Sequence, residues 1–199
     1  RTAGAQEYFA RIAPRWDEER SLHAADVEVE QAIVELVGEH HRSVLDVGTG
    51  TGRMLQLLGG HAERAIGLDS SHSMLAVARA NLERAEVRNA DLRQGDVYSP
   101  PFDRNSFDLV VIHQVLHFLD DPGRALAEAA RVLKPGGRLI VVDFAPHSLE
   151  HLRSEHAHRH LGVSEADFER WAGKAGFAVK SAKTFRSPGG DKGVAVTVW

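Results

Sequence analysis

The sequence has no cysteine among its 199 residues. This absence excludes disulfide bonds, thiolate metal ligands and cysteine nucleophiles. The sequence also lacks an apolar run of the roughly 18 residues that a membrane-spanning helix needs, and it lacks a signal-peptide pattern. The formal net charge of -4 disfavours direct binding of a nucleic-acid backbone by this segment. We therefore expect a cytoplasmic globular protein with no membrane partner.

From residue 43 onward, short apolar segments alternate with amphipathic ones, which predicts strands alternating with helices. The expected strands are 43–47, 64–69, 90–96, 107–113 and 138–144, and the expected helices are 52–59, 71–84 and 121–133. The last of these helices is expected to stop at Lys134, where Pro135, Gly136 and Gly137 break it. Such alternation predicts an α/β fold with a mostly parallel sheet covered on both faces.

The N-terminal 41 residues differ from this pattern because they read as helical, with a break at Pro14. The second helical stretch places its apolar residues on one face, namely Val29, Ile33, Leu36 and Val37. We expect residues 1–41 to form a helical lid on a single domain that spans residues 42–199.

The C-terminal part is expected to add helices and a hairpin. Residues 147–162 read as helical, and Ser164 is placed to cap a further helix over 165–176. Two closing strands, 177–185 and 193–199, flank a Pro-Gly-Gly turn. The hairpin would complete a seven-stranded sheet with an antiparallel edge.

A glycine-rich segment, VLDVGTGTGRML (44–55), follows the first predicted strand and opens a helix. Gly48, Gly50 and Gly52 permit a tight turn and a close approach of a ligand to the backbone. Arg53 stands where a dinucleotide-binding loop would have its third glycine. This departure disfavours a nicotinamide-dependent oxidoreductase, which would share the fold.

Carboxylates are predicted at the ends of three successive strands, at Asp46, Asp69 and Asp96. Ligands of open α/β sheets bind at the carboxyl ends of strands. Asp46 would repel a pyrophosphate, but it would attract the ammonium group of S-adenosylmethionine, which has no phosphate. Asp69 follows Gly48 by 21 residues, a spacing that suits the ribose hydroxyls. Asp96 suits the adenine amino group, although an aspartate before a proline-rich loop is often a turn former.

The segments VLDVGTGTG, GLDSS, QGDVYSPPF, FDLVVIHQVLHFLDDP and ARVLKPGGRLIVVDF resemble the successive motifs of class I S-adenosylmethionine-dependent methyltransferases. They are most similar to the small-molecule branch that includes the ubiquinone/menaquinone methyltransferases. The resemblance covers residues 5–145 approximately. It implies a Rossmann-like fold, S-adenosylmethionine as cofactor, and S-adenosylhomocysteine as product.

The resemblance also implies which residues contact each part of the cofactor. The glycine loop would wrap the methionine moiety, while Asp96 and Val97 would face the adenine. Tyr8 and Trp16 of the lid are candidates for contacts near the sulfonium, because cation–π attraction favours a charged ligand; packing explains Trp16 and Met74 equally well. The candidate cofactor-binding residues are Tyr8, Trp16, Asp46, Gly48, Thr49, Gly50, Gly52, Asp69, Ser70, Met74, Gly95, Asp96, Val97, His113 and Gln114.

A narrower resemblance concerns YFARIAPRWDEERSLH, HQVLHFLDDP and SEHAHRHLG, which are similar to bacterial ArsR-type regulators. In that family a winged-helix DNA-binding domain precedes a methyltransferase-like domain. The resemblance implies that such a domain precedes Arg1 and would supply any DNA contact, and a homodimer is a candidate assembly.

Methyl transfer requires alignment of the reacting atoms, and a general base is optional. His117, Asp143 and His147 follow the fourth and fifth strands and are candidate bases facing the acceptor, although a hydrogen-bonded structural role explains each of them better. The pairs His147/His151 and His156/His160 have helical metal-site spacing, but no glutamate completes a zincin motif, so no metal is predicted.

Two functions stay open from the sequence. The first is methyl transfer from S-adenosylmethionine to an unidentified small molecule. The second is a sensor of S-adenosylmethionine or S-adenosylhomocysteine that regulates an attached winged-helix domain. The residues Ser99-Pro100-Pro101-Phe102 superficially resemble a DNA methyltransferase motif, but they follow the third strand instead of the fourth.

Overall fold

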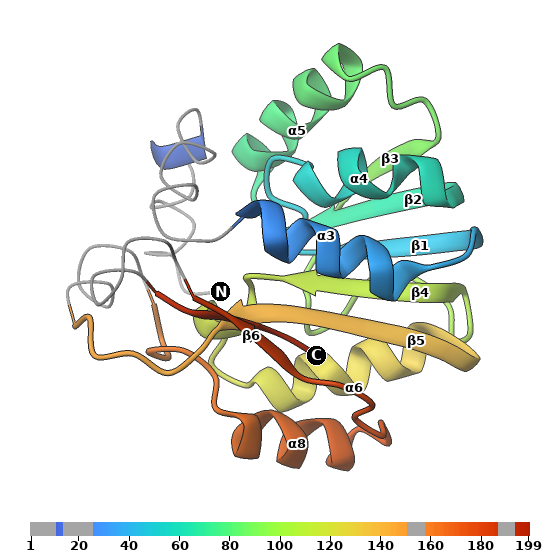
Figure 1. Cartoon of the computed structure of the whole chain (residues 1–199). Coiled ribbons are helices and arrows are strands. Elements are labelled where there is room, and N and C mark those ends of the chain that lie inside the picture. Colours follow the sequence, from blue (N-terminus) through green and yellow to red (C-terminus); the bar gives the residue numbers. More distant parts are fainter. Residues whose placement is uncertain (1–10, 14–25, 151–157, 187–193) are drawn as a thin grey trace.

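The computed structural model describes residues 11–13, 26–150, 158–186 and 194–199. They form one seven-stranded sheet with the order β3-β2-β1-β4-β5-β7-β6 (Figure 1). Strands β1 to β5 pair in parallel, whereas β7 runs antiparallel to both β5 and β6. The strands are β1 (His41–Val47), β2 (Ala62–Asp69), β3 (Ala90–Gln94), β4 (Phe107–His113), β5 (Leu133–Phe144), β6 (Lys183–Phe185) and β7 (Val196–Val198). The predicted mostly parallel sheet with an antiparallel edge is confirmed.

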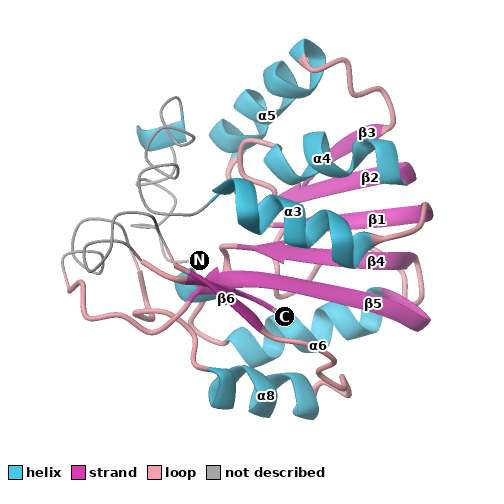
Figure 2. Cartoon of the chain, viewed as in Figure 1, coloured by secondary structure: helices cyan, strands magenta, loops and turns pink. Residues whose placement is uncertain are grey.

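Helices pack on both faces of the sheet (Figure 2). The helical elements are α3 (Asp26–Val37), α4 (Arg53–Leu58), η2 (Gly59–His61), α5 (His72–Arg84), η3 (Leu116–Phe118), α6 (Pro122–Val132) and α8 (Glu165–Lys174). Successive strand residues point to opposite faces. Val44 therefore packs in a core with residues of α3 and α4, while its neighbour Leu45 packs in a second core with residues of α6 and α8.

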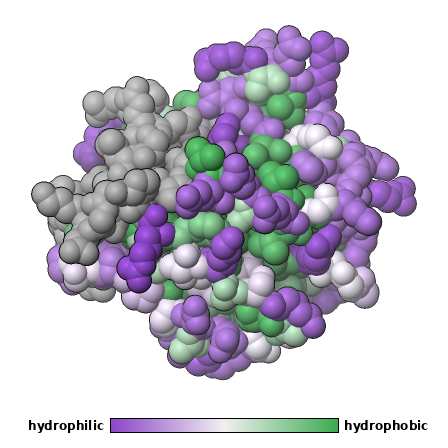
Figure 3. All heavy atoms as spheres, viewed as in Figure 1, coloured by the Kyte–Doolittle hydropathy of each residue, from purple (hydrophilic) through white to green (hydrophobic). Residues whose placement is uncertain are grey.

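Apolar side chains are concentrated in these two cores. Among the described residues, Val27 and Val179 are the only large hydrophobic ones that are exposed. The face in Figure 3 shows hydrophilic side chains interspersed with small hydrophobic groups. Within the described ranges, none of the helices combines the length and the apolarity that crossing a bilayer requires.

Helix α3 has the apolar face that its sequence predicts. Val29, Ile33 and Val37 are buried in the first core, with Leu36 partly buried beside them. The Arg138 guanidinium donates to the carbonyl oxygens of Leu36 (3.0 Å) and Val37 (3.1 Å), which satisfies acceptors that the last turn of a helix leaves open. The apolar face of the helix is therefore buried on the sheet, and its last turn is bound to β5.

The predicted helix over 147–162 is wrong for its described parts, 147–150 and 158–162, which are not helical. The His147 N–H donates to the Leu161 carbonyl (3.1 Å), and the Val163 N–H donates to the Phe144 carbonyl (2.7 Å). The backbone groups thus bond across two antiparallel segments, and this tertiary pairing replaces the local helical bonds that the sequence pattern favours.

The third strand is shorter than predicted, since β3 ends at Gln94. Asp96 therefore does not end a strand. Its Oδ1 accepts from the Tyr98 N–H (2.9 Å), and its carbonyl accepts from the Ser99 N–H (3.1 Å). These bonds form the turn that an aspartate in this position favours.

The fifth strand begins earlier than predicted. Helix α6 ends at Val132, and β5 starts at Leu133, so the Lys-Pro-Gly-Gly segment belongs to the strand instead of preceding it. The pairing of β4 with β5 shifts register between Phe107 and Leu109. Gly136 has a φ of 78°, a left-handed value that such an irregularity requires.

The closing hairpin pairs as predicted, but β6 and β7 have only three residues each. Residues 187–193, which include the predicted turn, lie outside the described residues, as do Tyr8, Pro14 and Trp16. The division into a lid (1–41) and a domain (42–199) stays a prediction.

Candidate functional site

The glycine loop follows β1, and its three glycines all have left-handed φ values, of 73°, 54° and 84° at Gly48, Gly50 and Gly52. A Cβ on Gly48 would lie 2.4 Å from Cγ2 of Val115, a residue that follows β4. The loop thus needs glycine there for two reasons, backbone conformation and close packing. Gly52 is the N-cap residue of α4 and packs against Ala78.

Asp69 holds this loop to the end of β2. Its Oδ2 accepts from the Gly50 N–H (3.0 Å), and its Oδ1 accepts from the Ser71 N–H (2.8 Å). The Ser71 hydroxyl in turn accepts from the Met74 N–H (3.3 Å) and caps α5. Of the predicted cap Ser70–Ser71, Ser71 is the capping residue. One carboxylate therefore orients the first two loops of the sheet.

Asp46 is the buried acidic group of the site, with 1% of its surface exposed. Burial raises the pKa of Asp46 to about 7, against a smaller opposing effect of the Thr49 hydroxyl and with a further increase from the neighbouring Asp69 carboxylate. Among the described residues, its Oδ2 has no hydrogen-bond partner. A cationic hydrogen-bond donor would complete this site and favour the ionised form.

Two adjacent cavities open at the carboxyl ends of β1, β2 and β4. The first is lined by the loop and by residues after β4, and the second by residues after β2 and β3. Gly48 and Asp69 line both. The predicted residues in the first cavity are Asp46, Gly48, Thr49, Gly50, Asp69, Met74, His113 and Gln114, and those in the second are Gly48, Asp69, Ser70, Gly95, Asp96 and Val97. The structure thus brings together the described candidates for cofactor binding, except Gly52, which lines neither cavity.

Met74 lines the first cavity and also packs in a small apolar cluster with Ile12, Ala13 and Phe118. Met74 therefore has both of the predicted environments, since it packs against apolar side chains and also lines the cavity. Ile12 and Ala13 belong to the first part of the predicted lid, and both are buried. These two residues thus pack against side chains that line the first cavity.

The backbone after β4 has an unusual conformation at Gln114, whose φ is 54°. Its N–H donates to the Val142 carbonyl (2.7 Å), which holds the residue at the junction of β4 and β5. Left-handed backbone at a residue other than glycine is costly and recurs at functional sites. Gln114 is buried and lines the first cavity.

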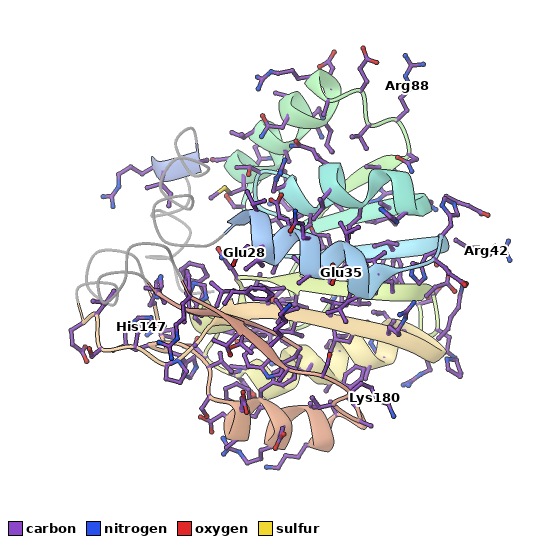
Figure 4. All side chains as sticks on the ribbon, in the orientation of Figure 1. Glu28, Glu35, Arg42, Arg88, His147 and Lys180 are labelled. Atoms are coloured by element: carbon purple, nitrogen blue, oxygen red, sulfur yellow. The ribbon has the colours of Figure 1, made fainter. Side chains whose placement is uncertain are left out.

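The three candidate bases have different environments. His117 and Asp143 form a buried pair, with Nδ1 and Oδ1 2.6 Å apart, and neither lines the two cavities described above. The expectation that they face an open cleft therefore differs from the structure. His147 is half-buried near the carboxyl end of β5, at the opposite edge of the sheet from Arg42 (Figure 4). Within the described residues, no group of three histidine or acidic side chains could hold a metal ion.

Several residues that line the first cavity were not predicted from the sequence, namely Thr51, Arg53, Met54, Val115 and Phe118. Two of these, Arg53 and Met54, directly follow the glycine loop. Phe118 could have been predicted from the sequence. It is an aromatic residue in the segment after β4, and the ligand was expected to bind at the carboxyl ends of the strands.

Arg53 also connects the loop to α3. Its guanidinium forms a two-bond pair with the Glu30 carboxylate, with nitrogen–oxygen distances of 2.7 and 2.6 Å. Paired, planar contacts of this kind restrict the arginine geometry. The first helix after the loop is therefore fixed relative to α3.

Comparison with known proteins identifies the fold and the family. Residues 45–141 match the family model of a methyltransferase domain. The demethylmenaquinone methyltransferase of Thermus thermophilus is 37% identical over 145 residues, which cover 69% of this chain and 64% of that protein. The chain spans less than two thirds of the length of the curated relatives it matches.

Solved structures with the same fold include a chain of the complex between the Haloferax volcanii Trm112 methyltransferase activator and a methyltransferase. That chain has a TM-score of 0.77 and 24% identity, with 98% of this chain and 96% of that chain covered. The Haemonchus contortus phosphoethanolamine N-methyltransferase 2, solved with S-adenosyl-L-methionine, has a TM-score of 0.68 and 21% identity, with 83% and 40% covered. Sheet order, motifs and relatives agree that the chain carries a class I S-adenosylmethionine-dependent methyltransferase domain of the menaquinone-methyltransferase-like branch.

Proposed function

We propose that this chain transfers the methyl group of S-adenosylmethionine to a small molecule bound beside the carboxyl ends of β4 and β5. The observation that supports cofactor binding most directly is Asp46, a buried carboxylate on the wall of a cavity whose Oδ2 has no hydrogen-bond partner in the described part of the chain. An ammonium group matches it in charge and in hydrogen bonding. The methionine moiety of the cofactor has that group.

The other residues of the two cavities suit the rest of the cofactor. Asp69 is at the end of β2 and would accept the ribose hydroxyls, and Asp96 and Val97 would contact the adenine. Because Gly48 and Gly50 have no side chain, the cofactor could approach their backbone closely. Bound S-adenosylmethionine supplies an already activated methyl group, so the chain has mainly to align the acceptor and exclude water.

The acceptor would be held next to His113 and Gln114, because these residues follow β4 and line the cavity. The N-terminal segment would cover the cofactor, as Ile12 and Ala13 already cover Met74. Within this proposal, the lid residues Tyr8 and Trp16, the homodimer, and an upstream DNA-binding domain are predictions that the contacts described above do not address.

The test compares Asp69→Ala with the matched control Asp91→Ala, since Asp91 is an exposed carboxylate on β3, paired with Arg64 at 3.0 Å. We expect Asp69→Ala to weaken binding of S-adenosylhomocysteine by about 1–3 kcal/mol in isothermal titration, because charge-assisted hydrogen bonds are lost. Asp91→Ala should leave binding unchanged. Equal affinity in wild type and Asp69→Ala would contradict the ribose assignment.

A methyl-transfer assay distinguishes the proposed methyltransferase from a domain that only senses the cofactor. The wild-type chain would be incubated with S-adenosylmethionine labelled in the methyl group and an extract of small metabolites. Transfer of label to a small molecule, reduced in Asp69→Ala, is expected of a methyltransferase. Tight binding with no transfer to any component would support the sensing alternative instead.

A further inference from the structure

The inference concerns Arg53, the residue of the first cavity that directly follows the glycine loop. Among the described residues that line this cavity, Arg53 is the only arginine or lysine. Two acidic residues, Asp46 and Asp69, line the same cavity. The cavity wall therefore carries groups of both signs, and the proposed function gives a role only to the negative ones.

The methionine moiety of the proposed cofactor also carries both signs. Its α-carbon bears an ammonium group and a carboxylate, so the residues that bind these two groups must line the same space. Asp46 suits the ammonium group, because its Oδ2 is a buried acceptor with no partner in the described part of the chain. The ligand carboxylate, in contrast, would be repelled by Asp46 and Asp69 unless a positively charged side chain lay beside it.

The Arg53 side chain has the charge and the hydrogen-bond donors that a carboxylate requires. A guanidinium is always charged and has five N–H donors in a planar fork. The Glu30 carboxylate accepts from Nε (2.7 Å) and from Nη2 (2.6 Å), which uses two of the five donors. The remaining donors point along the other edges of the planar group, where a second carboxylate can bind.

The pair with Glu30 also restricts where the guanidinium lies. The Glu30 side chain is 14% exposed, and it belongs to α3, which Val29 and Ile33 anchor in the first core. The Arg53 side chain is 42% exposed, so a ligand and solvent can both reach it. Solvent weakens the attraction between exposed charges, so we expect a moderate effect of this residue on affinity.

His113 is the other basic residue among those that line the cavity. An unperturbed histidine is neutral above about pH 8, so its imidazole does not offset a carboxylate there. Arg53 keeps its charge at that pH. Within the described part of the cavity wall, Arg53 is therefore the group that matches the ligand carboxylate in alkaline solution.

On the basis of the proposed function, we propose that Arg53 binds the α-carboxylate of S-adenosylmethionine and makes the cavity specific for an amino-acid moiety. Asp46 and Arg53 then bind the two charged groups of one α-carbon. A nucleoside that keeps the sulfur and the amine but has lost the carboxylate leaves this contact unmade. Specificity is a difference of affinities, so Arg53 selects the intact cofactor over its decarboxylated form.

The test compares three ligands of the full chain by isothermal titration at about pH 8.5, where histidine is neutral. They are S-adenosylhomocysteine, its decarboxylated analogue and its deaminated analogue, in which hydrogen replaces the carboxylate or the ammonium group. We expect wild type to bind the decarboxylated analogue about tenfold more weakly than S-adenosylhomocysteine, because a charge-assisted hydrogen bond is lost. Arg53→Met keeps the aliphatic stem and should bind these two ligands equally, within about twofold, since the combined changes of ligand and side chain isolate that contact.

The control Arg88→Met removes an exposed arginine before β3 that lines neither cavity, and it should keep the wild-type preference (Figure 4). The deaminated analogue gives a second control, because it lacks the group assigned to Asp46. It should bind more weakly than S-adenosylhomocysteine to wild type and to Arg53→Met alike.

Equal binding of S-adenosylhomocysteine and the decarboxylated analogue by wild type would overturn the assignment. A wild-type preference that persists in Arg53→Met would overturn it as well. The first comparison needs no variant, so it decides the question even if Arg53→Met does not fold, and Arg53→Gln then repeats the second comparison. The proposed function fails in a different way, namely if wild type binds none of the three ligands.

Discussion

We call the loops after β1 and β2 the cofactor side and the segments after β4 and β5 the acceptor side, following the proposed function, and these two regions are built in different ways. On the cofactor side, the loop after β1 and the cap of α5 are connected through the carboxylate of Asp69 and through backbone N–H groups. On the acceptor side, the main contact joins His117 to Asp143, 26 residues away, inside a cluster of rings. The first arrangement is held by backbone groups that are close in sequence, and the second depends on a contact between side chains that are far apart in sequence.

We expect the largest effect on the cofactor side from a substitution of Gly48. In Gly48→Ala, the new Cβ would lie 2.4 Å from Val115, and the backbone would remain at a φ of 73°. We expect the free energy of unfolding to fall by about 3 kcal/mol through overpacking and strain. Binding of S-adenosylhomocysteine should fall by more than about 100-fold, since each 1.4 kcal/mol is tenfold. Urea unfolding and isothermal titration measure the two effects.

The matched control is Gly60→Ala, because no atom lies within 4 Å of a Cβ at that position and its φ is not left-handed. This variant should unfold like the wild type and bind S-adenosylhomocysteine with the same affinity. Equal effects of the two substitutions would show that Gly48 is ordinary loop glycine, and the contrast between the two sides of the cleft would lose its main support.

Local chemistry explains why the cofactor side could be predicted from the sequence. The three glycines have left-handed φ values, and Ser71 caps α5, because glycine spacing and capping residues act over a few positions. Asp46 and Asp69 lie at one edge because parallel strands end together. The prediction that Asp96 ends β3 is wrong for the same kind of reason, since its own turn bonds stop the strand.

The cofactor side can be tested further by pH through Asp46. Its pKa, raised to about 7, means that the carboxyl is half-protonated near neutral pH. An ammonium ligand binds the anion, so affinity for S-adenosylhomocysteine should rise with pH and plateau above about pH 8. Below the pKa the affinity should fall up to about tenfold per pH unit. Asp46→Asn should bind weakly at all pH values, with no such slope in isothermal titration.

Ionisation of Asp46 favours ligand binding but lowers the stability of the folded protein. The folded pKa of Asp46 lies above its ordinary value of 3.8, so the folded state holds the proton more tightly between those two values. The free energy of unfolding therefore falls as pH rises from about 4 to 7. At pH 8, Asp46→Asn should be more stable than wild type by about 2–4 kcal/mol, because each pKa unit is about 1.4 kcal/mol. A less stable Asp46→Asn in urea unfolding would contradict the buried-charge assignment.

The acceptor side could not be predicted to the same extent. His117 and Asp143 were separate candidates in the sequence, and only the parallel pairing of β4 with β5 brings them within 2.6 Å. The segment after β5 has a helical pattern, yet His147 and Val163 bond across to Leu161 and Phe144. Contacts between distant residues override local propensity there, and no local motif records them.

The smallest effects are expected from removal of the two serine helix caps, one of which lies on the cofactor side. Ser71 caps α5 beside Asp69, whereas Ser164 caps α8 with its hydroxyl accepting from the Asp167 N–H (3.1 Å). Each serine-to-alanine change should lower the free energy of unfolding by about 1 kcal/mol, the usual value of a cap. Only Ser71→Ala should also weaken S-adenosylhomocysteine binding, by about fivefold, because it loosens the first turn that Asp69 orients. Equal binding by both variants would mean that α5 can shift without disturbing Asp69, and recognition would then depend on the glycine loop alone.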